Sequence, residues 1–345
     1  MPATPYDPIA VVGPWTATDL VEVTDDTAAL DGSGRWMVTI TFEGRATLAR
    51  FATWERRPPA AEEVGSWDGP APEGWHSSLD EAAYIAAVEA VRGHISRGEV
   101  YQANICRVLR TAMSPESDVV ALHSRLIAGN PAPHAGALRL PDHGVHIASA
   151  SPELYLGRAA QHVTSRPIKG TGARETDLLA KDEAENVMIV DLVRNDLGRI
   201  CRTGTVTVPG LVEIESHPGL VHLVSTVSGD LRPGTTWPRI LEATFPPGSV
   251  TGAPKLAALD IIRAQEAGPR GPYCGAFGWV DADAGTAELA VAIRTFWRED
   301  SDSGPLLAFG TGAGITWDSD ARAEWRETML KAARLLAVAG DREVP

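Results

Sequence analysis

Four carboxylates occur as two pairs with helical spacing. Asp182 and Glu185 are three residues apart, as are Glu324 and Glu327. Residues at i and i+3 share one face of a helix, so two such helices bordering one cleft would bring up to four carboxylates together. That arrangement suits Mg²⁺, a hard ion held by few carboxylates with waters and substrate oxygens. Taken alone, each pair is more commonly a solvated helix face.

Two basic residues stand where a cation could act on a ligand. Lys169 lies in the constrained sequence RPIKGT (166–171), where its amine can serve as a counter-ion or, when neutral, as a nucleophile. Arg294 ends a predicted strand, and a guanidinium at the mouth of a sheet can hold a carboxylate through two parallel hydrogen bonds. A surface ion pair is the alternative for Arg294. The residue types leave both choices open.

Two glycine-rich turns could present backbone amides to an anion. The sequence FPPGSVTGAPK (245–255) leads into a predicted helix, whose first turn has free N–H groups. It lacks the spacing of a nucleotide-binding P-loop, so nucleotide binding is not supported. The sequence FGTGAGI (309–315) follows a strand and would let amides approach a ligand closely. On its own, such a loop is usually plain turn chemistry.

Helices and strands must position these residues, and the predicted strands occur in runs rather than in strict alternation with helices. Ser78-Leu-Asp-Glu81 has the form of a capping box and predicts the start of the first helix. In the next strand Gln102 and Asn104 alternate with apolar residues, so both side chains point the same way. Runs of strands predict an α+β fold with large antiparallel sheets. Helices are predicted at 79–97, 177–198, 236–243, 253–266 and 319–338, and strands at 99–110, 134–140, 145–149, 153–157, 205–214, 220–230, 273–281, 287–296 and 305–310.

Three regions follow one another along the chain. Residues 1–55 alternate short β-type runs with turn residues, which predicts a short N-terminal β-rich region. Residues 56–77 are rich in proline and glycine without an apolar period, which is typical of a linker. Residues 78–345 contain all the candidate residues named above and form the predicted catalytic domain.

The overall composition restricts the partners. The 345 residues carry a net charge of −14, which repels nucleic acid and anionic membrane surfaces, so an anionic substrate needs local positive charge. No apolar run approaches the length of a membrane span, and the N-terminus does not resemble a signal peptide. The three cysteines form neither a disulfide framework nor a metal-binding pattern. We therefore expect a cytoplasmic protein that binds neither nucleic acid nor membrane.

Nine segments, in this order, resemble the chorismate-binding enzymes, which include anthranilate synthase component I, aminodeoxychorismate synthase component I, isochorismate synthase and salicylate synthase. The resemblance runs from about residue 80 to 338. It implies an α+β fold in which two large antiparallel β-sheets pack face to face with helices outside, with chorismate and Mg²⁺ bound between the sheets. The segments are EVYQANICR, SASPELYL, RPIKGTGAR, KDEAENVMIVDLVRNDLGR, VHLVSTVSG, FPPGSVTGAPK, RGPYCGAFGWV, AVAIRT and GTGAGITWDSDARAEWRETMLKA.

The same resemblance implies roles for residues of this chain. The metal ligands would be Glu185 and Glu327, with Asp182 and Glu324 as water-mediated supports. Glu153 would be the general acid at the C4 hydroxyl of chorismate. The groups that hold the substrate carboxylates would be Arg294, Tyr273, Lys331 and the amides of Gly312 and Gly314, while His222 and Thr251 would lie near the ring.

Two positions separate the members of the family. The water-adding members carry a lysine general base where this chain has Gln102, which disfavours isochorismate and salicylate synthesis. Anthranilate synthases usually read PIAGT where aminodeoxychorismate synthases and this chain read PIKGT. The resemblance therefore implies an aminodeoxychorismate synthase component I that acts through a covalent intermediate on Lys169. Anthranilate synthase component I and an inactive chorismate-binding regulatory protein are the alternatives.

The resemblance also implies a source of nitrogen. Ammonia would replace the C4 hydroxyl to give 4-amino-4-deoxychorismate, for p-aminobenzoate and folate or for an antibiotic. No glutamine amidotransferase domain is visible in the sequence, and the cysteines lack the setting of its nucleophile. We therefore expect the ammonia to be free or to come from a separate glutamine amidotransferase subunit.

Overall fold

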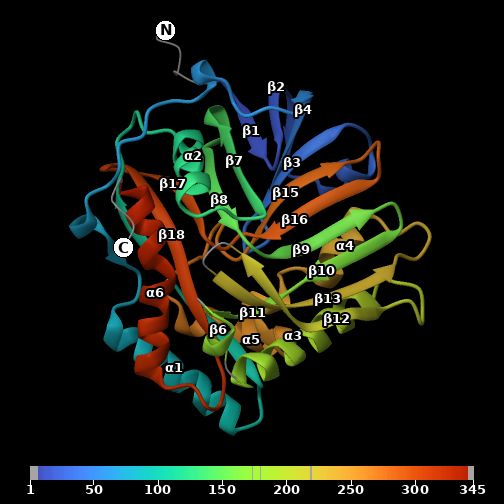
Figure 1. Ribbon diagram of the computed structural model, residues 1–345, viewed down its shortest axis with the longest axis vertical. Helices are drawn as coiled ribbons and strands as arrows, with labels where there is room; N and C mark the ends of the chain where they lie inside the picture. Colours follow the sequence, from blue (N-terminus) through green and yellow to red (C-terminus); the bar gives the residue numbers. More distant parts are fainter. Residues whose placement is uncertain (1–6, 173, 179, 218–219, 341–345) are drawn as a thin grey trace.

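One continuous antiparallel sheet of 18 strands organises the computed structural model, which describes residues 7–172, 174–178, 180–217 and 220–340 (Figure 1). Its first half comprises, in order of pairing, β6 (Gln102–Ala112), β18 (Gly304–Ile315), β17 (Thr295–Ser301), β8 (Val145–Ser151), β7 (His134–Leu140) and β1 (Ile9–Val12), with the short β5 (His76–Ser77) and β14 (Gly252–Ala253) beside β6.

The second half continues from the pairing of β1 with β2. It comprises β2 (Trp15–Thr24), β4 (Ala46–Glu55), β3 (Arg35–Ile40), β15 (Ala276–Asp281), β16 (Thr286–Val291), β9 (Leu154–Ala159), β10 (His162–Arg166) and β13 (Leu220–Asp230), with β11 (Ile168–Gly172) and β12 (Thr207–His217) also paired to β13. The chain thus forms two sheet halves that are joined at one corner.

The two halves face each other across a shared core. Cys106 and Val108 of β6 belong to the same buried apolar cluster as Phe277 of β15 and Leu289 of β16. Burial of this apolar surface is the main favourable contribution to the folded state. The α+β class, the antiparallel sheet and the outer helices are confirmed, and the two expected sheets are linked by hydrogen bonds through β1 and β2.

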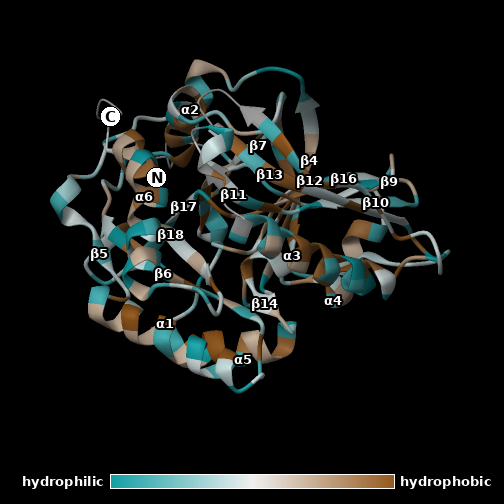
Figure 2. Cartoon of the chain, turned by 60° about the horizontal axis from the view of Figure 1, so that its bottom comes forward, coloured by the Kyte–Doolittle hydropathy of each residue, from teal (hydrophilic) through white to brown (hydrophobic). Residues whose placement is uncertain are grey.

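Helices cover the outside of this sheet. The outer face of β6 buries Ala103 and Ile105 against Tyr84, Val88 and Ile261 of the helices below it, where α1 and α5 lie side by side (Figure 2). The α3 helix packs on β13 at the other end of the sheet. The helices are α1 (Glu81–Ser96), α2 (Val119–Gly129), α3 (Ala180–Gly198), α4 (Trp237–Thr244), α5 (Lys255–Gln265) and α6 (Ala321–Ala339).

Several local predictions were wrong or incomplete. Asp80, not Ser78, caps α1, because its carboxylate accepts from Ala83 N at 2.8 Å while the Ser78 hydroxyl accepts from Val108 N. The strand predicted at 287–296 divides into β16 and β17, since Arg294 has a positive φ of 53° that interrupts the extended backbone. The sequence patterns also missed α2 and the strands β10 and β11.

The N-terminal region is built into the same sheet as the rest of the chain. The β1 strand pairs with β7, and β3 pairs with β15. In the segment predicted as a linker, Trp67 is buried and its Nε1 donates to Ala339 O at 2.8 Å, which ties this segment to the end of α6. Among the described residues, the helices all fall short of the length and apolar character that a membrane crossing requires.

Candidate active site

Lys169 lies in β11 with its amine turned to two acceptors. Its Nζ donates to Ser249 O at 3.0 Å and lies 3.9 Å from Glu185 Oε2, and its side chain is only 12% exposed. The next residue, Gly170, has a φ of 75°, and a Cβ there would lie 2.9 Å from Asp182 Cβ. A glycine after Lys169 therefore lets β11 approach α3 closely enough to bring Lys169 to Glu185.

Glu153 is a buried carboxyl beside this lysine. It follows β8 and is 4% exposed. Burial raises the pKa of Glu153 to about 7, against the opposing effects of Ser249 and Lys169. A carboxyl with such a pKa is partly protonated at neutral pH, so it can donate a proton to a leaving group.

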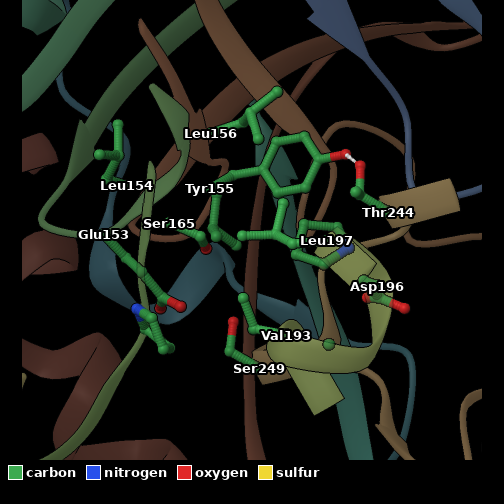
Figure 3. A pocket seen from close by; sticks show the side chains of 14 residues that line it. Glu153, Leu154, Tyr155, Leu156, Ser165, Val193, Asp196, Leu197, Thr244 and Ser249 are labelled. Atoms are coloured by element: carbon green, nitrogen blue, oxygen red, sulfur yellow. Dashed lines mark hydrogen bonds between the residues drawn. The ribbon is translucent and has the colours of Figure 1, made fainter. Parts of the chain in front are cut away.

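A small cavity borders Glu153. It has a volume of about 20 Å³, enough for about one water molecule. Figure 3 shows Glu153 and Ser249 toward one side of this cavity, and Asp196 and the hydrogen-bonded pair of Tyr155 and Thr244 toward the other. The Asp196 carboxylate is held by Lys255 Nζ at 2.6 Å.

Gln102 is fully buried and incompletely hydrogen-bonded. Its Nε2 faces Asn104 Oδ1 and Glu185 Oε2, both at 3.5 Å, while its Oε1 has no partner among the described residues. Gln102 and Asn104 point the same way, as the alternation in β6 predicts. An unpaired buried acceptor is costly, so it marks a place where a ligand could donate a hydrogen bond.

Charge interactions link the four acids predicted from the i, i+3 spacing, which lie on α3 and α6: Glu185 interacts with Asp182 and with Glu327, and Glu327 interacts with Glu324. Burial raises the pKa of Glu185, which Lys169 and Lys181 oppose and Asp182 and Glu327 reinforce. Burial also raises the pKa of Glu324, and Glu327 adds to this rise. Burial would raise the pKa of Glu327 too, but the charges of Lys331, Lys181 and Lys169 have the larger combined effect, so the pKa of Glu327 is lowered. The acids of the two helices therefore repel each other across one site.

These carboxylates could hold a divalent cation. Within the described part of the chain, three or more metal-binding side chains do not gather around a single point. Mg²⁺ does not require such a cage, since it is commonly held by one or two carboxylates with waters and substrate oxygens. A cation between Glu185 and Glu327 would relieve their repulsion. The residues present therefore fit Mg²⁺.

Arg294 is an unpaired cation at the break between β16 and β17. Its backbone carbonyl accepts from Ala150 N at 3.0 Å, but its guanidinium makes neither an ion pair nor a hydrogen bond with any described residue. Burial lowers the pKa of Arg294, and Arg334 adds to this effect. Among the described residues, Arg294 therefore does not form the surface ion pair that was its alternative role. A ligand carboxylate would supply the missing counter-charge.

The sequence 309–315, predicted to be a turn, is instead the end of strand β18, and it offers backbone amides along an open edge. The pairing with β17 stops at Phe309, whereas the pairing with β6 continues to Ile315. The amides of Cys106 and Asn104 bond to Glu266 and Thr251 instead of to β18. Their register partners Gly312 and Gly314 therefore turn their N–H groups away from β6, toward the open edge.

Lys331 lies at the same edge. Its Nζ donates to Gly312 O at 3.2 Å and pairs with Glu327 Oε1 at 2.7 Å. Tyr273 is buried against this part of β18, because a Cβ on Gly310 would lie 2.0 Å from Tyr273 Cγ. Burial raises the pKa of Tyr273, so its hydroxyl stays protonated. Lys331 and the two glycine amides thus offer donors to an anion at this edge.

We expect Gly310→Ala to displace the Tyr273 ring. Overpacking of this kind costs roughly 1–3 kcal/mol of unfolding free energy. Urea denaturation measures it, with Gly198→Ala as the matched control, because a Cβ on Gly198 meets nothing within 4 Å. The control should change the free energy of unfolding by no more than about 1 kcal/mol. Equal stabilities of the two variants would contradict the packing of Tyr273 against Gly310.

The two residues predicted to lie near the substrate ring, His222 and Thr251, occupy different elements of the fold. His222 is buried in β13, with Thr171 of β11 as its register partner. Thr251 is fully buried, but its hydroxyl donates to Pro247 O at 2.7 Å. Its backbone carbonyl accepts from Asn104 N, so Thr251 fixes the loop beside β6 rather than presenting a free hydroxyl.

The sequence patterns missed two contributors to the site. Ser249 supplies the carbonyl that accepts from both Lys169 and Asn104 Nδ2, the latter at 3.2 Å. The positive charge of Lys181 lowers the pKa values of Glu185, Glu324 and Glu327. Ser249 lies in the glycine-rich sequence 245–255, whose pattern indicates backbone amides, and not carbonyls, as the groups that contact a ligand. Lys181 directly precedes the acid pair of α3, and that neighbourhood was the available signal.

Known proteins with similar sequences include anthranilate synthases and aminodeoxychorismate synthases. Anthranilate synthase component 1 of Streptomyces coelicolor is 38% identical over 276 residues, which cover 76% of this chain and 52% of that protein. Aminodeoxychorismate synthase of Streptomyces pristinaespiralis is 40% identical over 267 residues, 74% of this chain and 36% of that protein. Aminodeoxychorismate synthase component 1 of Salmonella typhimurium is 37% identical over 274 residues, which cover 76% of this chain and 58% of that protein. The chain thus spans 36 to 58% of these relatives.

Solved structures share the fold, and a family model covers most of the chain. Anthranilate synthase component I of Streptococcus pneumoniae has a TM-score of 0.76 at 23% identity, covering 97% of this chain and 93% of that one. The menaquinone-specific isochorismate synthase of Escherichia coli has a TM-score of 0.77 at 17% identity, covering 98% and 90%. The model of the chorismate binding enzymes matches residues 22–337. With this match and the relatives above, the chain belongs to the chorismate binding enzyme family.

Proposed function

We propose that the protein is an aminodeoxychorismate synthase component I, which aminates chorismate at C4 with ammonia to give 4-amino-4-deoxychorismate. The observation that carries the proposal is the placement of Lys169, whose largely buried amine lies 3.9 Å from Glu185. Burial raises the pKa of the Glu153 carboxyl to about 7, and the charge of Lys169 opposes this rise, so the two groups are close enough to interact. A nucleophile beside a protonated carboxyl is what a substitution with an oxygen leaving group requires.

The reaction proceeds in two steps. The neutral amine of Lys169 adds through its lone pair to C2 of chorismate as the C4 hydroxyl departs, and Glu153 donates its proton so that the hydroxyl leaves as water; the new C2–N group then returns a proton to the Glu153 carboxylate. Ammonia then adds at C4 and the Lys169 amine leaves C2. The net change replaces water by ammonia and keeps the enol ether of the pyruvyl group. Covalent catalysis of this type divides one difficult substitution into two easier ones.

The other residues bind and orient the substrate. Arg294, Tyr273, Lys331 and the amides of Gly312 and Gly314 hold its carboxylates, and His222 and Thr251 border the ring. Glu185 and Glu327 would hold Mg²⁺, with Asp182 and Glu324 as supports through water. The bound metal would fix one carboxylate of chorismate and stabilise charge there as the bonds change. The Arg294 guanidinium, which forms no ion pair with a carboxylate of the described residues, supports this arrangement.

Gln102 would position the nitrogen nucleophile. Its buried Oε1 has no donor among the described residues, and an N–H of ammonia could supply one. A lysine at this position would instead be a base for water. The amide side chain therefore favours amination over addition of water.

The ammonia would come from a separate glutamine amidotransferase subunit or be taken up directly. The relative from Salmonella typhimurium is named as a component 1, which supports a two-component arrangement. The product would feed p-aminobenzoate and folate synthesis or an antibiotic pathway in the cytoplasm.

Anthranilate synthase component I is the second candidate, favoured by the relative from Streptomyces coelicolor. The test is to incubate the protein with chorismate, ammonium and Mg²⁺ and to identify the product by mass. We expect 4-amino-4-deoxychorismate, which retains the pyruvyl group. Fluorescent anthranilate would contradict the proposal and support the second candidate. Binding of chorismate without turnover would instead support an inactive regulatory protein.

A further inference from the structure

Arg107 is a buried cation that the proposed chemistry does not use. It lies in β6, five residues after Gln102, and is 2% exposed. Among the described residues, its guanidinium has no carboxylate partner. It donates through Nε to Thr328 Oγ1 at 3.0 Å, through Nη1 to Ser77 Oγ at 3.1 Å and through Nη2 to Met329 Sδ at 3.0 Å.

Burial of a charge without a counter-ion is costly. Burial lowers the pKa of Arg107, which reflects this cost. The ring of Trp325, 4.3 Å from the guanidinium carbon, offsets part of it through a cation–π contact. An apolar residue of similar size would fill the space without the cost. Arg107 therefore does not serve mainly to stabilise the fold, and its role follows from the groups to which its guanidinium is bonded.

Three of the four groups that contact Arg107 belong to one turn of α6. Trp325, Thr328 and Met329 lie at i, i+3 and i+4, and so form one face of the helix. Thr311 of β18, the strand that carries the glycine amides, donates to Thr328 O at 2.9 Å. Two neighbouring strands therefore hold the same helical turn through Thr328.

The adjacent face of this turn carries the acids and the lysine of the site. Glu324, Glu327 and Lys331 follow one another at i, i+3 and i+7. A helix is rigid over two turns, so a rotation or shift at Thr328 would move all three side chains together. The contacts of Arg107 and Thr311 with Thr328, together with the packing of α6 on β18, α1 and α2, therefore set the distance of these side chains from Gln102 and Glu185.

We propose that Arg107 is a positioning residue, which holds α6 against β6 so that Glu324, Glu327 and Lys331 meet the groups of α3 and β6. The catalytic consequence rests on the function proposed above, whereas the positioning of α6 does not. A residue that supports ligand-bearing elements in this way commonly affects metal affinity or activity by about 10- to 100-fold.

The first measurement follows the helix itself. Spin labels on Glu183→Cys in α3 and Arg326→Cys in α6 report the distance between the two helices, since both positions are exposed and Cys106, Cys201 and Cys274 are buried. We expect a single narrow distance distribution in the labelled parent and a broader or shifted one with Arg107→Met. Arg110→Met is the matched control, because Arg110 lies in the same strand but pairs with Glu299 at 2.6 Å.

The second measurement follows ligands. Mn²⁺ serves as the probe in place of Mg²⁺, and its binding is measured by electron paramagnetic resonance together with KM for chorismate. We expect Arg107→Met to weaken Mn²⁺ binding and to raise KM by 10-fold or more, about the size of such supporting contacts. Thr328→Val removes the acceptor of Arg107 Nε with little change of shape and should act in the same direction. It keeps the test decisive if Arg107→Met does not fold.

The outcomes separate the two proposals. A loss of thermal stability with unchanged label distance, Mn²⁺ affinity and KM would overturn the positioning role and leave Arg107 as a residue of the fold alone. A changed distance with unchanged Mn²⁺ affinity and KM would overturn the claim that this placement of α6 serves the site. A parent protein that binds no Mn²⁺ would contradict the proposed metal site, and the label distances with KM would still decide the role of Arg107.

Discussion

Lys169→Ala is expected to lower the rate of 4-amino-4-deoxychorismate formation by roughly 10²–10⁴-fold, the range for a positioned catalytic group. The reason is that the variant has no amine to form the bond at C2. The measurement is chorismate turnover with ammonium and Mg²⁺, with the product quantified by mass. Ser249 and Glu185, which contact Lys169, remain in place, so the loss should appear in kcat more than in KM.

Lys169→Arg separates the roles of nucleophile and counter-ion. Arginine keeps the positive charge beside Glu185 but is too basic to become a neutral nucleophile. If Lys169 forms the covalent intermediate, Lys169→Arg should be about as inactive as Lys169→Ala. If Lys169 only compensates charge, the arginine variant should retain most of the activity.

The covalent intermediate can also be sought directly. With ammonia withheld, the unmodified protein should accumulate a chorismate adduct that intact-protein mass spectrometry detects and peptide mapping places on Lys169. Lys181→Ala is a control, because Lys181 lies near the same acids but not on β11. Absence of the adduct together with full activity of Lys169→Ala would rule out the covalent route.

Glu153→Gln is expected to lower kcat by roughly 10²–10⁴-fold, because glutamine cannot protonate the leaving hydroxyl. In the unmodified protein, burial raises the pKa of Glu153 to about 7. The protonated form is the active one, so kcat should be highest below pH 7 and fall tenfold per pH unit well above it. The decline should be missing from the residual activity of Glu153→Gln.

The same group makes a prediction about stability. The pKa of Glu153 is about 7 in the folded protein, above the ordinary carboxyl value of 4.5. Between these values the folded protein binds more protons than the unfolded one, so the contribution of Glu153 to stability is present at low pH and is lost as pH rises through 7. Glu153→Gln should flatten this part of the pH dependence of urea unfolding. An unchanged slope between pH 5 and pH 7 would contradict the raised pKa.

Part of the fold was predictable because it depends on local periodicity. The alternation of apolar and polar residues in β6 placed Gln102 and Asn104 on one side of a strand, and the runs of strands gave the α+β class. The split between β16 and β17 was not predictable, because the apolar pattern continues through Arg294 while its φ of 53° is set by the surrounding contacts. The α2 helix was missed although Asp118 caps it, accepting from Val120 N.

The sequence by itself determined which chemical groups are available: the nine family segments, the two acid pairs at helical spacing and the lysine in RPIKGT. These features depend on neighbours within a few residues. Only the tertiary structure decided how the groups meet, because the contacts join segments far apart in the chain. It placed Lys169 beside Glu185 and buried Glu153, and it left the Arg294 guanidinium unpaired among the described residues. It also buried Arg107 under α6, because desolvation and pairing are set by long-range packing.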